Sequence, residues 1–380
     1  MDSHILVTRS SMPPLEEYVA EIAPLWESHW LTNMGEKHKE FERLLKEYLG
    51  ANNVALFVNG HNALECAIEA LGLGADGRRK VITTPFTFAS TTHAIVRKGL
   101  EPVFADVRES DYTIDPEQVA RLAADPEVCA VLPVHVYGNL CDVDAIQSIA
   151  DERGLKVLYD AAHAFGVERR RPDGSWESAA SFGDASMFSF HATKVFNTVE
   201  GGAVCFRDPA LKPVLDQWKN FGITGPEDVE YVGGNAKMNE LCAAMGICNL
   251  RHLDEEIAKR RMVAARYCEQ LEGVRGLHLS PLHEGVRSNF AYMPILFEGE
   301  APAERDAAMA ALAETGIGSR KYFYPLTSEF ACYAGRFDSS MTPVALRLSR
   351  QVLCLPMYAD LALEDVDRIC RIVAGSRGRS

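Results

Sequence analysis

The chain has 380 residues, of which 47% are hydrophobic and 24% are charged, and its formal net charge is −14. This composition suits a folded protein with one large core or two linked ones, and it argues against disorder. The acidic balance and the absence of a long basic run predict that nucleic acid is not a partner. No stretch approaches the roughly 20 apolar residues of a membrane helix, and the opening MDSHILVTRSSMPPLEEYV lacks the apolar region of a signal peptide. We therefore expect a cytoplasmic protein that does not span a membrane.

The ten cysteines are scattered along the chain, mostly inside apolar stretches and never as CxxC. This pattern predicts buried, reduced thiols rather than disulfides. It also predicts that the protein has no zinc site or other metal site.

In chain order, a helical segment at 15–30 comes first, followed by a helix at 36–49, and the first segment is a candidate for packing across a subunit boundary. From about residue 40 to about residue 210, strand-like apolar runs then alternate with helical patterns, which is typical of a mainly parallel sheet wrapped by helices. Strands are expected at 54–58, 81–84, 102–105, 130–134, 156–159, 185–189 and 203–206, and helices at 61–71, 89–98 and 142–153.

The pattern becomes long and helical from about residue 240, beginning with 240–253 and continuing through 255–271, and this helix is expected to bridge two domains. A strand at 290–297 and helices at 303–315 and 363–373 complete the chain. The fold class is therefore predicted as α/β, with a large domain over residues 1–250 and a smaller α+β domain over residues 251–380.

The segment GLGADG matches the GxGxxG pattern of dinucleotide-binding proteins through Gly72, Gly74 and Gly77. A dinucleotide site requires this pattern to follow a strand and to open a helix. Here it follows a helix and precedes a strand, so we expect a helix C-cap and turn instead.

Two segments carry the residues best suited to catalysis. In KVLYDAAHAFG an apolar strand places Asp160 at its carboxyl end, with His163 shortly after, at the edge where the active groups of open α/β sheets collect. In SFHATKVFN, Lys194 lies between Phe190 and Phe196, and apolar surroundings favour the free amine that forms imines. Alone, a strand-end Asp is most often a turn cap and a lysine near aromatics most often lies along an apolar surface. Together they indicate a catalytic site.

This pair is what pyridoxal phosphate (PLP) chemistry requires: a carboxylate that keeps the pyridine nitrogen protonated and a lysine that holds the aldehyde as an imine. Asp160 and Lys194 supply these two groups. The cofactor phosphate needs N–H donors and hydroxyls, which we expect from the helix start at 60–63 and from Ser189. Phe88, which follows a strand, is a candidate for stacking on the ring.

With these residues, the sequence resembles the DegT/DnrJ/EryC1/StrS family of sugar aminotransferases, which have the type I aspartate aminotransferase fold. The resemblance covers most of the chain, through FVNGHNALECAIEAL, TTPFTFASTTHAIV, VLPVHVYG, YDAAHAFG, FSFHATKVFNTVEGGAV, GGNAKMNELCAA and FYPL. It implies that Lys194 is the Schiff-base lysine and that Asp160 is the partner of the pyridinium nitrogen. It also implies cofactor contacts from Gly60, Phe88, His163 near the 3-oxygen, Ser189 and, from the neighbouring subunit of a homodimer, Asn235.

Two positions depart from the usual family pattern. The glycine–threonine pair of the family is Gly60-His61 here, and the arginine before the methionine is Lys237. Backbone amides can still bind a phosphate, so His61 is kept among the cofactor-binding residues while the role of its side chain stays open.

Similar enzymes transfer an amino group from L-glutamate to a keto sugar on a nucleoside diphosphate, with ping-pong kinetics and with the lysine moving the proton. The motifs PFTFASTTHAIV and SFHATKVFNTVEGG resemble those of the family branch that aminates carbon 4 of dTDP-4-keto-6-deoxyglucose. This branch includes enzymes of antibiotic deoxysugar pathways. Candidate contacts to the sugar nucleotide are Lys219, Asn220, Arg320, Tyr322 and Tyr324.

Three alternative functions share some of these features. Amination at carbon 3 would use the same cofactor residues, and spacing alone does not separate it from amination at carbon 4. A related class performs PLP-dependent sugar dehydration with a histidine in place of the lysine, and Lys194 argues against that reaction. A PLP-binding regulator is disfavoured by the acidic charge and by the absence of a recognisable DNA-binding element.

Overall fold

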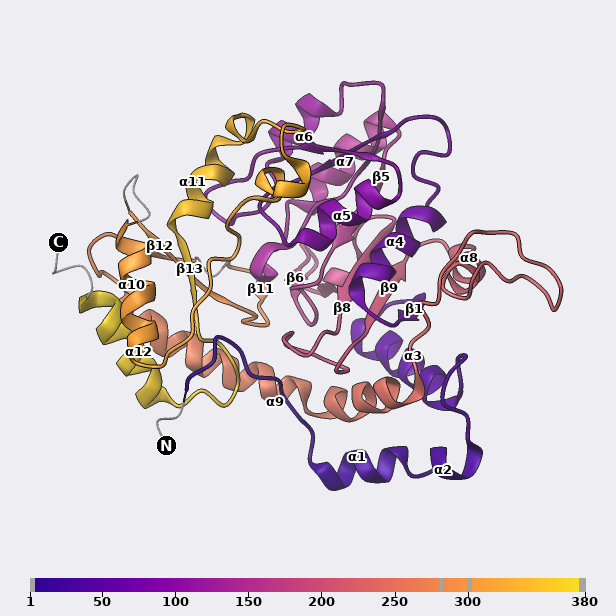
Figure 1. The fold of residues 1–380 in the computed structure, drawn as a ribbon, viewed down its shortest axis with the longest axis horizontal. Helices are drawn as coiled ribbons and strands as arrows, with labels where there is room; N and C mark the ends of the chain where they lie inside the picture. Colours follow the sequence, from indigo (N-terminus) through magenta and orange to yellow (C-terminus); the bar gives the residue numbers. More distant parts are fainter. Residues whose placement is uncertain (1–3, 281–282, 299–302, 376–380) are drawn as a thin grey trace.

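The computed structural model describes residues 4–280, 283–298 and 303–375. A seven-stranded sheet forms the centre of the larger part of the molecule (Figure 1). In spatial order its strands are β1 (Val54–Phe57), β9 (Gly202–Phe206), β8 (Ala185–Ser189), β5 (Lys156–Asp160), β4 (Val128–Val131), β2 (Lys80–Thr83) and β3 (Glu101–Phe104). Neighbouring strands pair in parallel from β8 to β3, whereas β9 is antiparallel to both β1 and β8. The predicted α/β class is confirmed.

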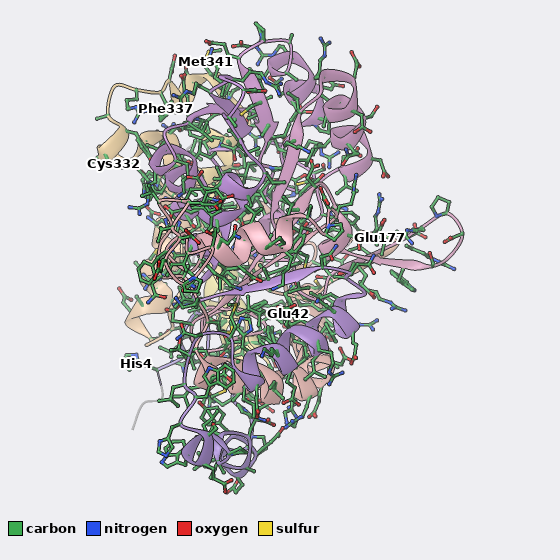
Figure 2. The ribbon with its side chains drawn as sticks, turned by 90° about the vertical axis from the view of Figure 1, so that its right-hand side faces the viewer. His4, Glu42, Glu177, Cys332, Phe337 and Met341 are labelled. Carbon is green, nitrogen blue, oxygen red and sulfur yellow. The ribbon has the colours of Figure 1, made fainter. Side chains whose placement is uncertain are left out.

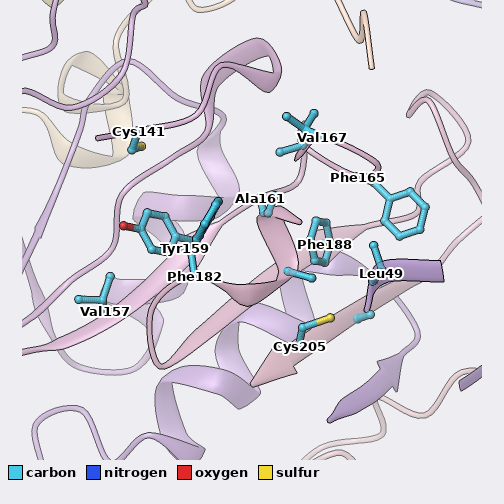
Figure 3. Packing of buried hydrophobic residues seen from close by; sticks show 14 of the residues in the cluster. Leu49, Cys141, Val157, Tyr159, Ala161, Phe165, Val167, Phe182, Phe188 and Cys205 are labelled. Atoms are coloured by element: carbon cyan, nitrogen blue, oxygen red, sulfur yellow. The ribbon is translucent and has the colours of Figure 1, made fainter. Parts of the chain in front are cut away.

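Helices cover both faces of this sheet, because successive strand residues point to opposite sides. In β8, Met187 belongs to a core cluster with α4 and α5, whereas Phe188 belongs to a second cluster with α3 and the first half of α9. Figure 3 shows part of the second cluster, in which Phe188 lies beside Phe165 and Leu49. The helices of the larger part are α3 (Glu36–Leu49), α4 (Gly60–Ala70), α5 (Ala89–Arg97), α6 (Pro116–Leu122), α7 (Val143–Arg153) and α8 (Leu211–Trp218).

The long helix α9 (Glu240–Leu271) runs from the large sheet to a second, three-stranded sheet (Figure 1). Its Ile247 lies in the core beside the large sheet, whereas its Val263 and Tyr267 lie in a separate core cluster with the second sheet. The long helical segment expected from residue 240 to residue 271 is therefore confirmed as one continuous helix. The second sheet and its helices are β10 (Leu277–Leu279), β12 (Met293–Phe297), β13 (Val352–Leu355), α10 (Ala303–Glu314), α11 (Pro343–Gln351) and α12 (Leu363–Gly375).

The predicted domain boundary at residue 250 falls inside α9. Ile5, from the N-terminal end of the chain, packs in the core of the second sheet and forms a bridge with Ile317. The division into residues 1–250 and 251–380 stays a prediction.

The N-terminal helical segment consists of two helices, α1 (Leu15–Ile22) and α2 (Leu25–Ser28), rather than one. Pro24 separates them, because proline has no N–H to continue the first helix. A small third sheet was not anticipated: β11 (Val286–Arg287), β6 (Glu168–Arg170) and β7 (Trp176–Ser178) are short and polar, without a hydrophobic period. The hairpin of β6 and β7, which carries Glu177, projects from the body of the molecule (Figure 2). The Glu177 carboxylate accepts hydrogen bonds from Arg169 and Arg171.

Short 3-10 helices occur in the connections: η1 (Val136–Gly138), η2 (Ala179–Ser181), η3 (Thr327–Glu329), η4 (Ala331–Tyr333) and η5 (Ser339–Met341). The glycines of GLGADG lie in the turn between α4 and β2, where Gly72, Gly74 and Gly77 all have positive φ. The expected turn after a helix is thereby confirmed for this segment. Across the described ranges, none of the helices has the length and apolar character needed to cross a bilayer.

Candidate active site

A cavity of about 390 Å³ opens at the carboxyl ends of β5 and β8, beside the N-termini of α4 and α5. Ligands of open α/β sheets bind at this edge. The cavity brings together eight of the residues predicted from the sequence: Gly60, His61, Phe88, Asp160, His163, Ser189, Lys194 and Tyr322.

Asp160 ends β5 with its carboxylate almost fully buried on the cavity wall. One oxygen accepts a hydrogen bond from the Thr91 hydroxyl at 2.8 Å, and the other accepts one from the Ala162 N–H at 3.1 Å. Burial raises the pKa of this carboxyl, and the two hydrogen bonds and the charge of Lys194 oppose the rise. A buried carboxylate of this kind is stabilised by a cation placed against it.

Lys194 follows β8 in the loop at 190–200 and lines the same cavity. Burial lowers the pKa of its amine from 10.5 to about 8, whereas the charge of Asp160 acts to raise it. The Tyr292 hydroxyl lies 3.4 Å from the lysine Nζ. Because the pKa is lowered, a larger fraction of the amine is unprotonated near neutral pH than in an exposed lysine, and this form can act as a nucleophile or a base.

His163 is buried between two aromatic rings on the cavity wall. It stacks on Phe323 at 5.9 Å between ring centroids and lies 4.7 Å from the ring of Tyr292. Burial and the charge of Lys194 lower its pKa well below the ordinary value. Since the Tyr137 N–H donates to Nδ1 at 3.1 Å, the neutral ring carries its proton on Nε2. His163 can thus donate one hydrogen bond without adding a charge.

The opposite end of the cavity is formed by the first turn of α4 and by Ser189. Asn59 caps this helix through its side chain, which accepts from the Asn62 N–H at 2.8 Å. A Cβ at position 60 would come within 2.7 Å of the Ser189 Cβ, so only glycine permits this close approach. The helix start and the nearby hydroxyl together suit an anion such as a phosphate.

Five predicted residues do not line the cavity, namely Lys219, Asn220, Asn235, Arg320 and Tyr324. Lys219 is fully buried, and its ammonium contacts Asp216 at 2.7 Å and the Leu56 carbonyl at 3.2 Å, which leaves it no surface for a sugar nucleotide. Asn220 accepts from Lys237 Nζ at 2.7 Å. Arg320 pairs with Cys354 through its backbone, and its side chain is exposed, as is that of Tyr324.

Asn235 is exposed and forms a backbone bridge with Asn220, away from the cavity of its own chain. This position is compatible with the implied contact to a neighbouring subunit.

Several residues that line the cavity, or that hold its lining residues in place, were not foreseen. The Thr91 hydroxyl donates to Asp160 and lies next to the Thr87 hydroxyl. Thr91 belongs to the run AST that follows Phe88, and the threonines one helical turn apart were a sequence signal for this contact. Tyr292 reaches Lys194 from a segment 98 positions later, and no local pattern marks it. The other unforeseen lining residues include Asn59, Ser90, His191, Thr193, Glu200 and Phe323.

These residues fit PLP. Asp160 offers a buried carboxylate to a protonated ring nitrogen, Lys194 offers a partly unprotonated amine to an aldehyde, and the helix start beside Ser189 offers donors to a phosphate. Within the described part of the chain, no group of three or more His, Cys, Asp or Glu side chains is arranged to hold a metal ion.

Comparison with known proteins finds similar enzymes along nearly the whole chain. Two curated relatives share the name dTDP-4-amino-4,6-dideoxy-D-glucose transaminase: one from Shigella dysenteriae is 40% identical and matches 97% of this chain and 98% of its own length. The other, from Escherichia coli, is 38% identical, over 98% of this chain and 99% of its own length. The crystal structure of DesI in the presence of its TDP-sugar product superposes with a TM-score of 0.91 at 33% identity, covering 100% of this chain and 95% of that one.

Residues 15–374 match the DegT/DnrJ/EryC1/StrS aminotransferase family as a whole. The resemblance read from the motifs is therefore confirmed. The chain belongs to the DegT/DnrJ/EryC1/StrS aminotransferase family, and it is a PLP-dependent sugar aminotransferase.

Proposed function

We propose that the protein transfers the amino group of L-glutamate to the C4 keto group of dTDP-4-keto-6-deoxy-D-glucose. The products are dTDP-4-amino-4,6-dideoxy-D-glucose and 2-oxoglutarate. The observation that carries the chemistry is the pair of Lys194, with its lowered pKa, and the buried Asp160 in one cavity. The choice of carbon 4 is supported by the names of the relatives at 40% and 38% identity.

Bound PLP supplies an aldehyde that takes up the amino group and a ring that accepts electrons. In our proposal Asp160 holds the ring nitrogen in its protonated form, and Thr91 and the Ala162 N–H keep the carboxylate in place. Lys194 holds the cofactor at rest and carries the proton between the two carbons that exchange it during transfer. His163 donates from Nε2, Ser189 and the α4 start hold the phosphate, and Phe88 covers the ring.

The proposal includes a homodimer with a shared site, in which Asn235 of one chain reaches the phosphate end of its neighbour. Exposed apolar side chains support such an interface, since a monomer rarely exposes large groups of them. Near Asn235, Val232 is 95% exposed and Val229 is 65% exposed. On α1 and α2, at the lower edge of the molecule in Figure 1, Leu15 and Trp26 are 70% and 67% exposed.

Of the candidate sugar-nucleotide contacts, we retain Tyr322, which lines the cavity and whose carbonyl accepts from the Tyr137 hydroxyl. Asn220 is retained for the shared site because it pairs with Asn235. Arg320 and Tyr324 are exposed outside the cavity, and they are proposed only as contacts to the outer part of the nucleotide.

Amination at carbon 3 is the second candidate. A relative from Micromonospora megalomicea named dTDP-3-amino-3,4,6-trideoxy-alpha-D-glucose transaminase is 33% identical, over 90% of this chain. Because this identity is lower than that of the relatives named for carbon 4, we rank carbon 4 first.

All ten cysteines are free, which supports a reducing compartment, and we propose the cytoplasm. Membership of an antibiotic deoxysugar pathway stays a prediction.

The test is to incubate the protein with PLP, L-glutamate and dTDP-4-keto-6-deoxyglucose and to locate the new amine by NMR. We expect an amine at carbon 4, formed together with an equal amount of 2-oxoglutarate. The Lys194→Ala variant is the matched control and should form neither product. An amine only at carbon 3, from a 3-keto substrate offered in parallel, would replace our assignment by the second candidate.

A further inference from the structure

A chain of polar contacts leads away from the phosphate end of the cavity through His61. Its Nδ1 lies 2.8 Å from the Ser90 hydroxyl, and its Nε2 lies 3.4 Å from Glu65, one helical turn further along α4. Glu65 in turn accepts from Arg97 of α5 at 2.5 Å. Both His61 and Ser90 line the cavity, whereas Glu65 is buried behind them.

The charge state of Glu65 determines whether the Nε2 nitrogen of the His61 ring carries a proton. Burial by itself would raise the pKa of this carboxyl, but hydrogen bonds from His61 and Arg97 lower it to about 2. Glu65 is therefore an acceptor at neutral pH, and His61 Nε2 must carry a proton to donate to it. The other ring nitrogen, Nδ1, faces the Ser90 hydroxyl. It carries no proton when the ring is neutral and one proton when the ring is protonated.

These two states present different groups to the cavity. When the ring is neutral, Nδ1 accepts the Ser90 hydroxyl proton, and Ser90 can offer only lone pairs to a ligand. When the ring is protonated, Nδ1 donates to the Ser90 oxygen, and the hydroxyl proton is free to donate to an anion. The protonated state also places a positive charge beside the α4 start, where anions already bind favourably.

We propose that His61 is a positioning residue that takes up one proton from solvent when the cofactor phosphate binds, and that this proton turns the Ser90 hydroxyl into a donor toward that phosphate. The inference rests on the proposed placement of the phosphate at the α4 start. It gives a role to the residue that departs from the usual family pattern. The proton returns to solvent when the phosphate leaves.

Charged and titratable groups on α4, β5 and α5 surround the His61 ring. Glu65 on α4 stabilises the protonated ring directly, and Asp160 on β5 interacts with its charge across the cavity. On α5, Arg97 opposes a second positive charge but is itself neutralised by Glu65. His93, also on α5, has its pKa lowered by burial and then by the charges of His61 and Arg97, which disfavours its protonated form.

The test compares PLP with pyridoxal, which has the same ring and aldehyde but no phosphate. Dissociation constants of both for the apoprotein are measured from about pH 8.5 to about pH 6, the range in which imidazoles titrate. In the wild type, the ratio of the pyridoxal to the PLP dissociation constant should grow by about tenfold as the pH falls. The reason is that a charge-assisted hydrogen bond is stronger than a neutral one. Calorimetry in buffers of different ionisation enthalpy should show proton uptake with PLP that is absent with pyridoxal.

Two variants and one control variant test whether His61 or another titrating group causes the pH dependence. His61→Gln keeps a hydrogen-bonding side chain without a titrating ring and should lose most of this excess pH dependence. Glu65→Gln should weaken it, whereas Glu69→Gln, the same change on the same helix at a residue paired with Lys98, should behave as the wild type. Thermal unfolding of each apoprotein checks that the variants fold.

An equal pH dependence for pyridoxal, or an unchanged dependence in His61→Gln, would overturn the proposal. Failure of the wild type to bind either compound through Lys194 would instead count against the proposed cofactor site itself.

Discussion

Asp160 and His163, on the inner wall of the cavity, are 4% and 5% exposed, whereas Phe88 at the cavity and Val232 beside Asn235 are 59% and 95% exposed. The inner residues have fixed partners from the same chain: Thr91 and Ala162 for the carboxylate, and the Tyr137 N–H for the imidazole. The outer residues are instead largely exposed. In our proposal, the inner residues of one chain perform the chemistry, and the outer residues are available to the substrate and to a second chain.

The largest effect should come from the inner wall. Asp160→Asn keeps the size of the side chain and the hydrogen bond from Thr91, but it removes the negative charge that holds the ring nitrogen protonated. We expect kcat for amino transfer to fall by at least about 10²-fold, as for the loss of a preorganised electrostatic group. Steady-state kinetics with saturating PLP measure this. Asp184→Asn, which removes a carboxylate that pairs with Lys156 outside the cavity, is the matched control, and equal losses in both variants would refute the special role of Asp160.

A mixed-subunit experiment tests the outer surface. Asn235→Asp places a negative charge where the neighbouring phosphate is expected, and we predict that PLP binding weakens by roughly tenfold through like-charge repulsion. When this variant is mixed with Lys194→Ala under conditions of subunit exchange, each mixed dimer should regain one intact site. The activity of the mixture at limiting PLP should therefore exceed the sum of the two separate variants. No gain in a mixture that demonstrably exchanges subunits would mean that Lys194 and Asn235 serve the same-chain site or different sites.

A smaller effect should appear in stability. Burial lowers the pKa of Lys194 from 10.5 to about 8, so below about pH 8 the folded apoprotein holds a proton that costs it free energy of folding. Lys194→Met removes this cost, and we expect the apo variant to be more stable than the wild type by about 1 to 3 kcal/mol at pH 7. The free energy of unfolding of the wild type should rise toward that of the variant as the pH rises from about 8 to 10.5, because the lysine then loses its proton. Denaturant unfolding measures the difference, and Lys156→Met, at an exposed lysine, should show no comparable gain.

Local patterns foretold the inner wall well, for a physical reason. The apolar runs that form β5 and β8 end at Asp160 and Ser189, and parallel strands deliver their last residues to one edge of a sheet. Strand period and chain order are enough to place such residues together.

Contacts made across long sequence separations could not be foretold in the same way. Tyr292 reaches Lys194 because the connection between β11 and β12 places it on the cavity wall, and His61 meets Ser90 because α4 and α5 pack side by side. Lys219 was expected to contact a sugar nucleotide, but it ends α8 with its amine turned inward to Asp216. The spacing of an acid and a base three residues apart was a signal for that ion pair.

The most direct test of the central claim is to reduce the PLP-loaded protein with borohydride, digest it and map the modified peptide by mass spectrometry. We predict one phosphopyridoxyl group per chain, attached to Lys194, and loss of the visible absorbance of the lysine-bound cofactor on reduction. The Lys194→Ala variant should retain no covalent cofactor. Modification of a different lysine in the wild type, or persistent covalent cofactor in Lys194→Ala, would contradict the assignment of this cavity as the active site.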